Sequence, residues 1–560
     1  MILLINKKMN NFCSFWPIVI FFFICKIFFN FFLYAKILPC AVHDDALFLK
    51  LAASISNGCW LGEYNALTLS KGPIFPLFLC FIRTINMPYE LAASFFYSLC
   101  VVYIICKIRP LFHTNTALFL LSILLFFDPI GFEPRFTRTW LYVSTMYVVA
   151  GCLINCFIHK NSSNIFEIFF VFICFGMAYF VREESAIILA VIFFTSICLL
   201  IYRIYFKNKI QIIYIISGCC GIMFFHFLLC SINLAFYNNF VDIETTSSPF
   251  REAYSQLITI SDPIERPDIF LSIDKIHELS KISPSISLIE NCMTRGHTHN
   301  AWAKMSYSLN LKTLEWFSDE NKQNVTGDLT RWELLACAQN AGLYGDASTS
   351  KQFYNNIIHD IDYAYKNNLI KKNNKKIVFS GLYIDIGDIS RLVKGIIFGI
   401  RNGFLKPNRP LQSIGLSMSE GDHEKIVKIA NEYHLFFWDK ISPAVPSIFS
   451  KISYYFIGKI ILFYNIFYRV LFSFFFTLCA PILVYAFYKK DLHYFFIVSI
   501  LTFIAITRHI VLAAIQVTAF NSFVPEYMSI EYSAITILSC LFFDKFAYAV
   551  HHYWAYRHGK

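Results

Sequence analysis

An acidic pair, Asp44 and Asp45, stands a few residues after a long aromatic segment and opens the stretch DDALFLKLAASISNG. The apolar spacing of this stretch predicts a helix that begins at the pair and ends at Gly58. A carboxylate at a helix start is stabilised by the helix dipole, which by itself accounts for the pair. The same carboxylates, held at a membrane surface and followed by Lys71 and a short apolar helix in GPIFPLFLCFIRTI, could also act on a lipid-linked substrate.

Two further clusters of acids and bases fall close to apolar segments. The first comprises Asp128, Glu133, Arg135 and Arg138 in FDPIGFEPRFTRTWLY, and the second comprises Arg182, Glu183 and Glu184 in YFVREESAIILA. Ionisable groups this near to hydrocarbon are costly, so they normally pair or serve function. An interfacial salt bridge would explain either cluster alone. Three charged clusters that return to one face of the membrane favour a shared site.

A fourth element is Arg508, which precedes His509 inside the apolar run IAITRHIVLAAIQVTAF. A buried guanidinium needs an anion, and a phosphate group fits it well. A carboxylate on a neighbouring helix would serve equally, so both partners stay open for Arg508.

The composition shows what must position these groups. The chain has 560 residues, of which 57% are hydrophobic and only 15% are charged, too apolar for a soluble globular protein. A membrane-crossing helix needs about 20 mostly apolar residues. Ten segments qualify: 14–34, 90–109, 114–131, 140–158, 164–181, 186–205, 210–236, 467–488, 492–513 and 529–548. The first has no small-residue cleavage site after it and is therefore a retained helix. The predicted fold class is an all-α polytopic membrane protein.

Charge asymmetry predicts the orientation of the chain. If ten helices are counted, the Lys and Arg residues of the short loops and both termini fall on one side, which is the cytoplasmic side by the positive-inside rule. The formal net charge of +11 is then explained by loops that face anionic membrane lipid. The basic residues form no patch or motif, so nucleic acid is excluded as a partner. The frequent use of Asn, Lys, Ile and Phe is typical of an A+T-rich bacterial genome, which favours a location in the bacterial plasma membrane.

Three regions follow from this topology. They are an N-terminal membrane domain at 1–236 with its first outer loop at 35–89, an extracytoplasmic domain at 237–466, and C-terminal membrane helices at 467–560. The middle region should be mainly helical. One helix should open at Asp328 or Thr330 and stop near Gly342, and a second should follow it in DASTSKQFYNNIIHDIDYAYK. The stretch 451–466 has lysines among aromatics and should lie along the membrane interface.

Four of the 18 cysteines are predicted to lie outside the membrane: Cys40, Cys59, Cys292 and Cys337. In an oxidising compartment they could form two bridges, with Cys40 paired to Cys59 around the acidic pair, but free thiols explain them equally.

The quoted motifs resemble a known family. DDALFLKLA directly after the first membrane helix, the following GCWLGEYNALTLSKGPIFPLFL and the later VREES look like the GT-C superfamily of membrane glycosyltransferases. That superfamily includes protein mannosyltransferases and the aminoarabinose transferase acting on lipid A. The likeness covers about the first third of the chain. It implies a sugar donor carried on a polyprenyl phosphate and transfer to an extracytoplasmic glycan, lipid or protein acceptor.

The resemblance also implies roles for residues. Asp44 matches the family's first acid, which takes the proton from the acceptor hydroxyl, and Asp45 could assist it or bind a divalent cation. Lys71 would hold the departing phosphate. The substrate-binding set would be Lys71, Arg138, Arg182, Glu183, Glu184 and Arg508. His43 could ligate a metal or simply form a hydrogen bond, so the cofactor stays unknown.

One position departs from the family. Related sequences have an acid directly after the arginine of the second loop, whereas here Thr139 follows Arg138. If that acid is needed, Glu133 must replace it from another place, or the protein handles its acceptor or metal differently. Metal dependence is therefore an open question.

Three other functions compete with a glycosyltransferase. An O-antigen ligase or polymerase also has about ten spans and one large outer loop, but it depends on loop arginines rather than on an acid pair. A flippase or transporter would place its charges near the membrane midplane and often shows repeats between its halves. A catalytically silent relative that binds a glycolipid would explain Thr139.

Overall fold

The computed structural model describes most of the chain, with gaps. The described residues are 2–33, 35–37, 44–127, 136–158, 164–183, 186–206, 212–262, 269–310, 323–373, 376–379, 382–385, 389–405, 428–430, 432, 436–437, 448–488, 491–518 and 522–557. Among them, His43, Asp128, Glu133, Arg135, Glu184 and Cys40 do not occur, so the predictions made for these six residues lie outside the described residues.

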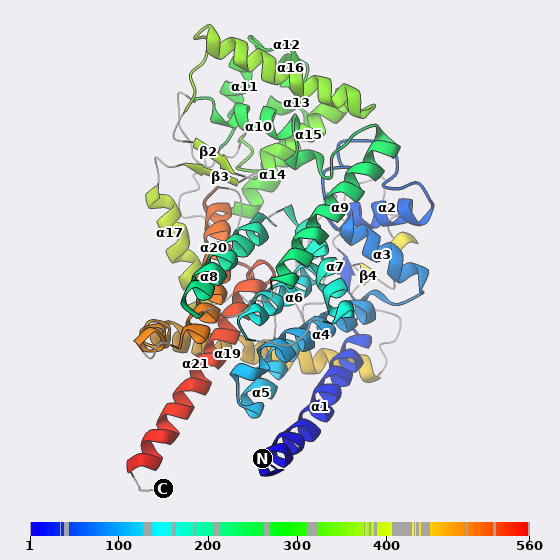
Figure 1. The fold of residues 1–560 in the computed structure, drawn as a ribbon. Coiled ribbons are helices and arrows are strands. Elements are labelled where there is room, and N and C mark those ends of the chain that lie inside the picture. The colour runs from blue at the N-terminus through cyan, green and yellow to red at the C-terminus, as the bar shows by residue number, and fades with distance from the viewer. Residues whose placement is uncertain are drawn as a thin grey trace.

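The protein is a mainly helical polytopic membrane protein, as predicted. The apolar helices are α1 (Ile2–Phe31), α4 (Tyr89–Ile108), α5 (Thr114–Phe126), α6 (Thr139–Ile158), α7 (Ile165–Val181), α8 (Ala186–Phe206), α9 (Ile213–Tyr237), α19 (Ile448–Tyr488), α20 (Leu492–Thr518) and α21 (Pro525–Arg557). Each of the ten predicted segments falls on one of them. Both chain ends lie at the end of the bundle opposite helices α10 to α16 (Figure 1).

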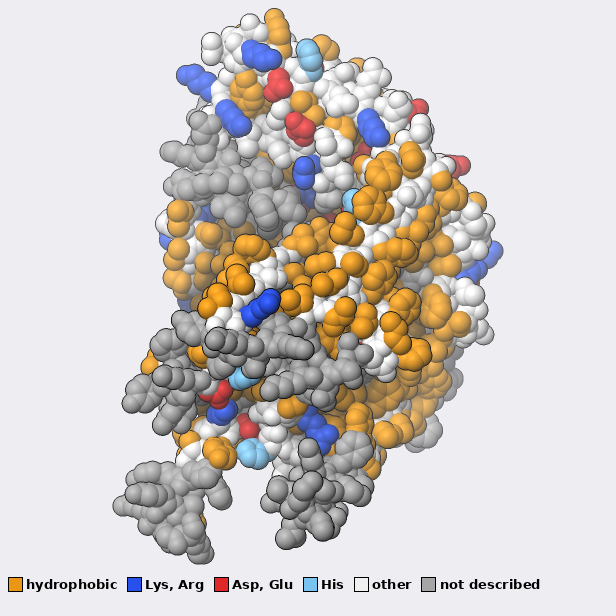
Figure 2. Space-filling model, in the orientation of Figure 1, with side chains coloured by type: hydrophobic (Ala, Val, Ile, Leu, Met, Phe, Trp, Pro, Cys, Tyr) orange, Lys and Arg blue, Asp and Glu red, His pale blue; other side chains and the backbone are white. Residues whose placement is uncertain are grey.

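Six described helices are long and apolar enough to cross a membrane by length and composition: α4, α6, α8, α9, α20 and α21. The other four predicted segments fall on helices whose described apolar part is shorter: Phe15–Phe31, Thr114–Phe126, Ile165–Val181 and Ile466–Leu478. The last of these belongs to α19, which runs across the view of Figure 1, transverse to α1 and α21. Apolar side chains cover the middle of the face shown in Figure 2, and charged side chains lie mainly above and below them.

Close helix packing builds the N-terminal half of the bundle. Helix α6 lies at its centre, with 94% of its most apolar window buried, and packs against α4 and α7. Helices α7 and α9 approach closely because a glycine faces the partner backbone. A Cβ at Gly221 would lie 2.1 Å from the carbonyl oxygen of Phe172. Small residues at such crossings let membrane helices pack backbone to backbone.

The first outer loop folds into two short helices, α2 (Asp45–Ser56) and α3 (Ile74–Thr84). They pack on each other, with the rings of Phe48 and Phe75 edge to face at 5.2 Å. Helix α2 ends where Gly58 takes a φ of +79°, a conformation that suits glycine. The predicted helix over this stretch is therefore confirmed, and the loop between α2 and α3 carries Lys71.

Residues 250–366, named the outer domain after their predicted location, form a cluster of helices above the bundle in the view of Figure 1. Its helices are α10 (Phe250–Thr259), α11 (Ile273–Ser280), α12 (Pro284–Ser287), α13 (Glu290–Thr294), α14 (His297–Asn310), α15 (Leu329–Asn340) and α16 (Ala347–Lys366). The two helices predicted from the sequence are α15 and α16. Asp328 stands at the N-cap of the first, and the Asp346 side chain accepts a hydrogen bond from the Thr349 amide at the start of the second. Cys337 of α15 forms a disulfide with Cys292.

Two small strand pairs and a return helix complete the fold. Strand β2 (Lys376–Phe379) pairs antiparallel with β3 (Leu382–Asp385), and β1 (Lys36–Ile37) pairs parallel with β4 (Phe436–Phe437). Helix α17 (Ile389–Gly399) then packs against α20 of the membrane bundle, where a Cβ at Gly395 would lie 3.1 Å from the Ala513 carbonyl oxygen. The chain thus re-enters the bundle before residue 466.

Candidate active site

Four charged side chains from three loops meet between the first outer loop and the ends of α6 and α7. They are Asp44, Lys71, Arg138 and Glu183. The ammonium of Lys71 forms an ion pair with Asp44, and the guanidinium of Arg138 lies 4.0 Å from the same carboxylate. Arg138 also holds Glu183 through two parallel hydrogen bonds of 2.9 and 2.8 Å. All four were selected from the sequence as candidate site residues, and the structure brings them together.

Burial separates the roles of the four groups. The side chains of Lys71 and Arg138 are only 5% and 9% exposed, and that of Glu183 is 22% exposed, whereas that of Asp44 is 48% exposed. The two cations are therefore fixed in the protein, and Asp44 is the group of the four that most readily reaches a substrate.

Two aromatic rings lie against the cations of the cluster. The ring of Phe48 lies under both cations, 5.6 Å from the Lys71 ammonium and 5.1 Å from the Arg138 guanidinium. The ring of Trp332 stands 5.1 Å from the Lys71 ammonium. Such cation–π contacts hold a charged head without consuming its capacity to donate hydrogen bonds to an anion.

Electrostatics follow from this burial. Burial lowers the pKa of Lys71 below its usual value, and the Asp44 carboxylate opposes this shift. Burial would raise the pKa of Glu183, but the guanidinium of Arg138 and the ammonium of Lys71 outweigh it and hold that pKa below its usual value. The Arg138–Glu183 pair is therefore ionised and internally neutralised, which leaves Lys71 and Asp44 as the groups open to exchange partners with a ligand.

The acidic pair is split by the start of α2. Asp44 stands at the N-cap position but makes no side-chain capping hydrogen bond, since its carboxylate points to Lys71 instead. Asp45, in the first turn of the helix, is buried at 2% exposure. Asp44 thus forms no capping hydrogen bond, although its carboxylate still lies at the start of α2, where the helix dipole favours a negative charge.

The loop that carries Lys71 is fastened on both sides. The backbone amide of Glu244 donates to the Leu69 carbonyl, and the Thr245 hydroxyl donates to the Ser70 carbonyl, each at 2.8 Å. Gly72 packs so tightly on α7 that a Cβ would lie 2.0 Å from the carbonyl oxygen of Phe180. These contacts hold the backbone on both sides of Lys71 in place.

A second group of hydrogen-bonded side chains surrounds Thr139, the residue that follows Arg138. The Thr139 hydroxyl accepts a hydrogen bond of 2.9 Å from Arg182 and donates one of 3.0 Å to Glu526. Thr137 donates to the same carboxylate oxygen at 2.8 Å. Glu526, in the first turn of α21, thus places an acid beside Thr139. Sequence reasoning missed it, although an acid at the outer end of the last apolar segment was a signal.

Arg182 and Arg508 both contact Tyr527, the residue that follows Glu526 on α21. The Arg182 guanidinium lies 4.9 Å from the ring centre of Tyr527, and Arg508 donates to the Tyr527 carbonyl at 3.3 Å. Arg508 is only 1% exposed and lies within electrostatic range of Glu531 on α21. The Tyr527 carbonyl and the Glu531 carboxylate are thus protein partners for Arg508. Binding of a phosphate by Arg508 stays a prediction.

The outer domain adds residues that the sequence did not indicate. Helix α15 places Trp332 over Lys71, and its Arg331 forms a 2.8 Å ion pair with Asp328. Burial raises the pKa of Asp328 to about 6, and Glu183 contributes to this shift. The first turn of α15 therefore faces the cluster and could contact a substrate that binds there.

Two other predictions concern cysteines and metals. Cys59 is an exposed free thiol, and Cys40, its predicted partner, lies outside the described residues. Within the described part of the chain, one group of side chains has the spacing of a metal site, and it consists of His226, Cys230 and Asp242 rather than of the acidic pair.

The chain was compared with family models, curated proteins and solved structures. No family model matches the chain, and no curated protein matches it. Among solved structures, the chain is similar to the crystal structure of ArnT from Cupriavidus metallidurans bound to undecaprenyl phosphate, with 9% identity and a TM-score of 0.29 over 94% of this chain and 76% of that one. A likeness this weak carries no argument about activity.

Proposed function

We propose that the protein is a membrane glycosyltransferase of the GT-C type that moves a sugar from a polyprenyl-phosphate donor to an extracytoplasmic acceptor. The observation that carries the proposal is the half-exposed Asp44 carboxylate beside two buried cations, Lys71 and Arg138. The sequence motifs that resemble the GT-C superfamily include both Asp44 and Lys71.

The chemistry assigns each group one task. Asp44 takes the proton of the acceptor hydroxyl while the oxygen bonds to the anomeric carbon of the sugar. The bond between that carbon and the phosphate oxygen breaks, and its electron pair leaves with the polyprenyl phosphate. Lys71 offsets the charge that develops on the departing oxygen, because a cation that the protein already holds in place needs no reorganisation during the reaction.

The remaining residues position the reacting groups. Glu183 holds Arg138 by two hydrogen bonds, so the guanidinium stays beside Asp44. Arg182, held by Thr139, provides a further cation for the phosphate. Asp328 and Trp332 of α15 are placed to bind a sugar or the acceptor. The acceptor is a lipid-linked glycan, lipid A or a protein.

The test uses a bacterial strain that lacks the gene and carries the intact chain, Asp44→Asn or Glu63→Gln at equal level. Glu63 is an exposed acid of the same loop and serves as the matched control. Mass spectrometry of lipid-linked sugars and envelope glycans should show a missing sugar and an accumulated polyprenyl-phosphate donor for the deletion and for Asp44→Asn. Glu63→Gln should restore the glycan. A glycan restored by Asp44→Asn contradicts the proposal.

A flippase is the second candidate, because one ionisable pair lies inside the bundle. His509 of α20 and Glu531 of α21 are 3.2 Å apart, and such intramembrane pairs occur in transport proteins. In the same strain, a flippase predicts that His509→Gln removes the glycan while Asp44→Asn restores it. The glycosyltransferase predicts the reverse order of severity.

A further inference from the structure

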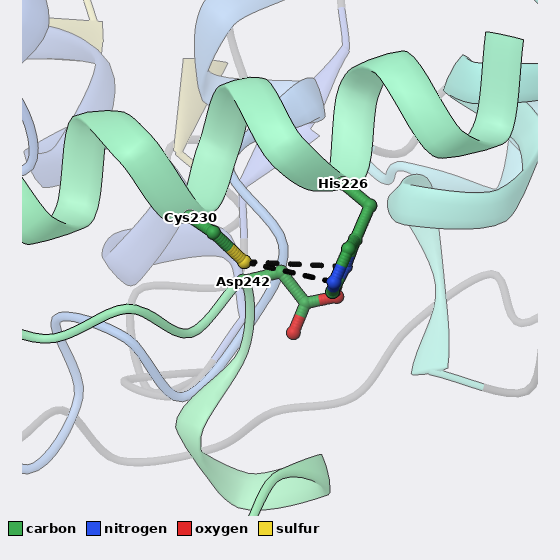
Figure 3. Close-up of side chains that lie close together, drawn as sticks. All are labelled: His226, Cys230 and Asp242. Atoms are coloured by element: carbon green, nitrogen blue, oxygen red, sulfur yellow. Dashed lines mark hydrogen bonds and ion pairs between the residues drawn. The ribbon is translucent and has the colours of Figure 1, made fainter.

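Three side chains with metal-ligand chemistry meet at α9, on residues that the proposed reaction does not use (Figure 3). The Nδ1 atom of His226 lies 3.1 Å from Oδ2 of Asp242, and the Cys230 sulfur lies 4.0 and 3.9 Å from the two ring nitrogens of His226. All three ligand atoms fall within 4.8 Å of one another.

The chain is built to bring them together. His226 and Cys230 are four residues apart, so they share one face of α9. The helix then ends at Asn238, which adopts the left-handed conformation with φ of 54° and turns the chain back. Asn233 secures this return by donating to the Val241 carbonyl at 2.7 Å while it accepts from the Trp60 indole at 2.8 Å.

The carboxylate of Asp242 is oriented before any ion binds. Its Oδ1 atom accepts hydrogen bonds from the Ile243 amide at 2.7 Å and from the Ser247 hydroxyl at 3.4 Å. These donors fix the carboxylate so that Oδ2 faces His226. Groups of this kind around a ligand set its direction and are a regular part of metal sites.

We propose that His226, Cys230 and Asp242 bind a divalent cation of the zinc class, with a water in the fourth position. A thiolate, an imidazole and a carboxylate form a donor set that suits this borderline-soft ion. With metal–ligand distances of about 2.0–2.3 Å, tetrahedral ligands lie roughly 3.4–3.6 Å apart. For Nδ1 of His226, the observed separations are 3.1 Å to Asp242 and 4.0 Å to Cys230, and they reach those values by shifts of about half an ångström or less. Asp242 and Cys230 lie within 4.8 Å of each other.

A simpler arrangement accounts for part of the geometry. A hydrogen bond between His226 and Asp242 needs no metal, and a buried cysteine commonly behaves as a small apolar side chain. The two arrangements differ in the thiol: a metal site requires Cys230 as a thiolate ligand, whereas the hydrogen-bonded pair does not.

The site would act on the loop that carries Lys71. Asp242 begins the segment whose Glu244 amide and Thr245 hydroxyl bind the carbonyls of Leu69 and Ser70. An ion bound at α9 would therefore tie this segment to the membrane bundle and keep the Lys71 loop in place. This role is structural and does not depend on which reaction the protein catalyses.

The experiment uses the full chain purified in detergent, with zinc and cobalt as probes. The intact protein and Cys220→Ser should each bind one zinc per chain, and cobalt should give a thiolate-to-metal charge-transfer band. Cys220 lies on the same helix and is exposed, so it is the matched control. Cys230→Ser should lose the cobalt band and weaken zinc binding at least about tenfold, since even the loss of a residue that only hydrogen-bonds a ligand can cost this much.

Two results would overturn the inference. One is an intact protein that binds no zinc or gives a cobalt spectrum without a thiolate band, which decides the matter even if a variant fails to fold. The other is Cys230→Ser that binds both metals as the intact protein does. Zinc should also raise the unfolding temperature of the intact chain but not that of Cys230→Ser, because an ion that binds the folded state stabilises it.

Discussion

Two carboxylates face Arg138, and neutralising each should change a different property. Glu183→Gln should mainly lower stability, whereas Asp44→Asn should mainly lower activity. Glu183 accepts two hydrogen bonds from a guanidinium that is only 9% exposed. Removing one partner of a buried ion pair costs about 3–5 kcal/mol, because it leaves a buried charge uncompensated. Arg138 would retain the Val181 carbonyl at 2.9 Å and Asp44 at 4.0 Å. We therefore expect Glu183→Gln to destabilise the protein by about 3 kcal/mol, the lower end of that range.

Asp44→Asn should cost far less stability. Its carboxylate is 48% exposed, and the buried Lys71 that pairs with it can release its proton, because burial already lowers the pKa of Lys71. The asparagine amide can still accept a hydrogen bond from Lys71. Activity should fall about 10²- to 10⁴-fold, the usual contribution of a general base. This loss corresponds to about 3–5 kcal/mol of activation free energy.

Unfolding of the purified chains, followed by tryptophan fluorescence, and glycan analysis in the deletion strain measure the two effects. Glu63→Gln should change neither. If Asp44→Asn destabilises the protein as much as Glu183→Gln does, Asp44 is a structural partner of Lys71 and its assignment as the base is wrong. An activity loss below tenfold at normal stability would refute that assignment as well.

Three further predictions concern the surroundings of the site. Gly72→Ala should abolish glycan transfer in the deletion strain and lower the unfolding temperature, because its Cβ would lie 2.0 Å from the Phe180 carbonyl oxygen; normal transfer would show that the fixed loop is not needed. Thr139→Val should destabilise the protein by about 1–3 kcal/mol in denaturant unfolding by leaving Glu526 short of a donor, and Thr139→Ser should not; equal effects would contradict the hydroxyl's role. Asp328 has a folded pKa of about 6, above its ordinary 3.8, so the folded state holds this proton more tightly and this group's contribution to stability falls as pH rises from 4 to 6. The stability of the intact chain relative to Asp328→Asn should therefore be higher at pH 4.5 than at pH 7, and a pH-independent difference in unfolding temperature would contradict the raised pKa.

Local patterns were sufficient for the elements. The Asp346 cap of α16 and the glycines that follow α2 and α15 act within a few residues, so their effects are visible in the sequence. The apolar segments likewise predicted where each membrane helix lies. The span lengths were less certain, because an apolar run does not show whether its helix crosses a membrane or, like α19, lies transverse to the others.

The site itself was predicted in part. Asp44, Lys71, Arg138 and Glu183 were selected because charges beside hydrocarbon must find partners, and they do meet. The sequence did not show that Glu526 would reach Thr139, since 387 positions separate them and helix packing alone brings them together.

The sequence by itself determined that the chain is a helical membrane protein and that its first outer loop carries an acid and a base, because burial of apolar residues and the cost of charge near lipid are local properties. Only the tertiary structure decided which of the paired acids meets the cations. Helix α2 directs Asp44 to Lys71 and buries Asp45, a choice set by the packing of α2 on α3. The same packing decided that α15 covers the cluster and that the return of the chain after α9 brings Asp242 to His226 and Cys230, since contacts between distant segments depend on how whole helices fit together.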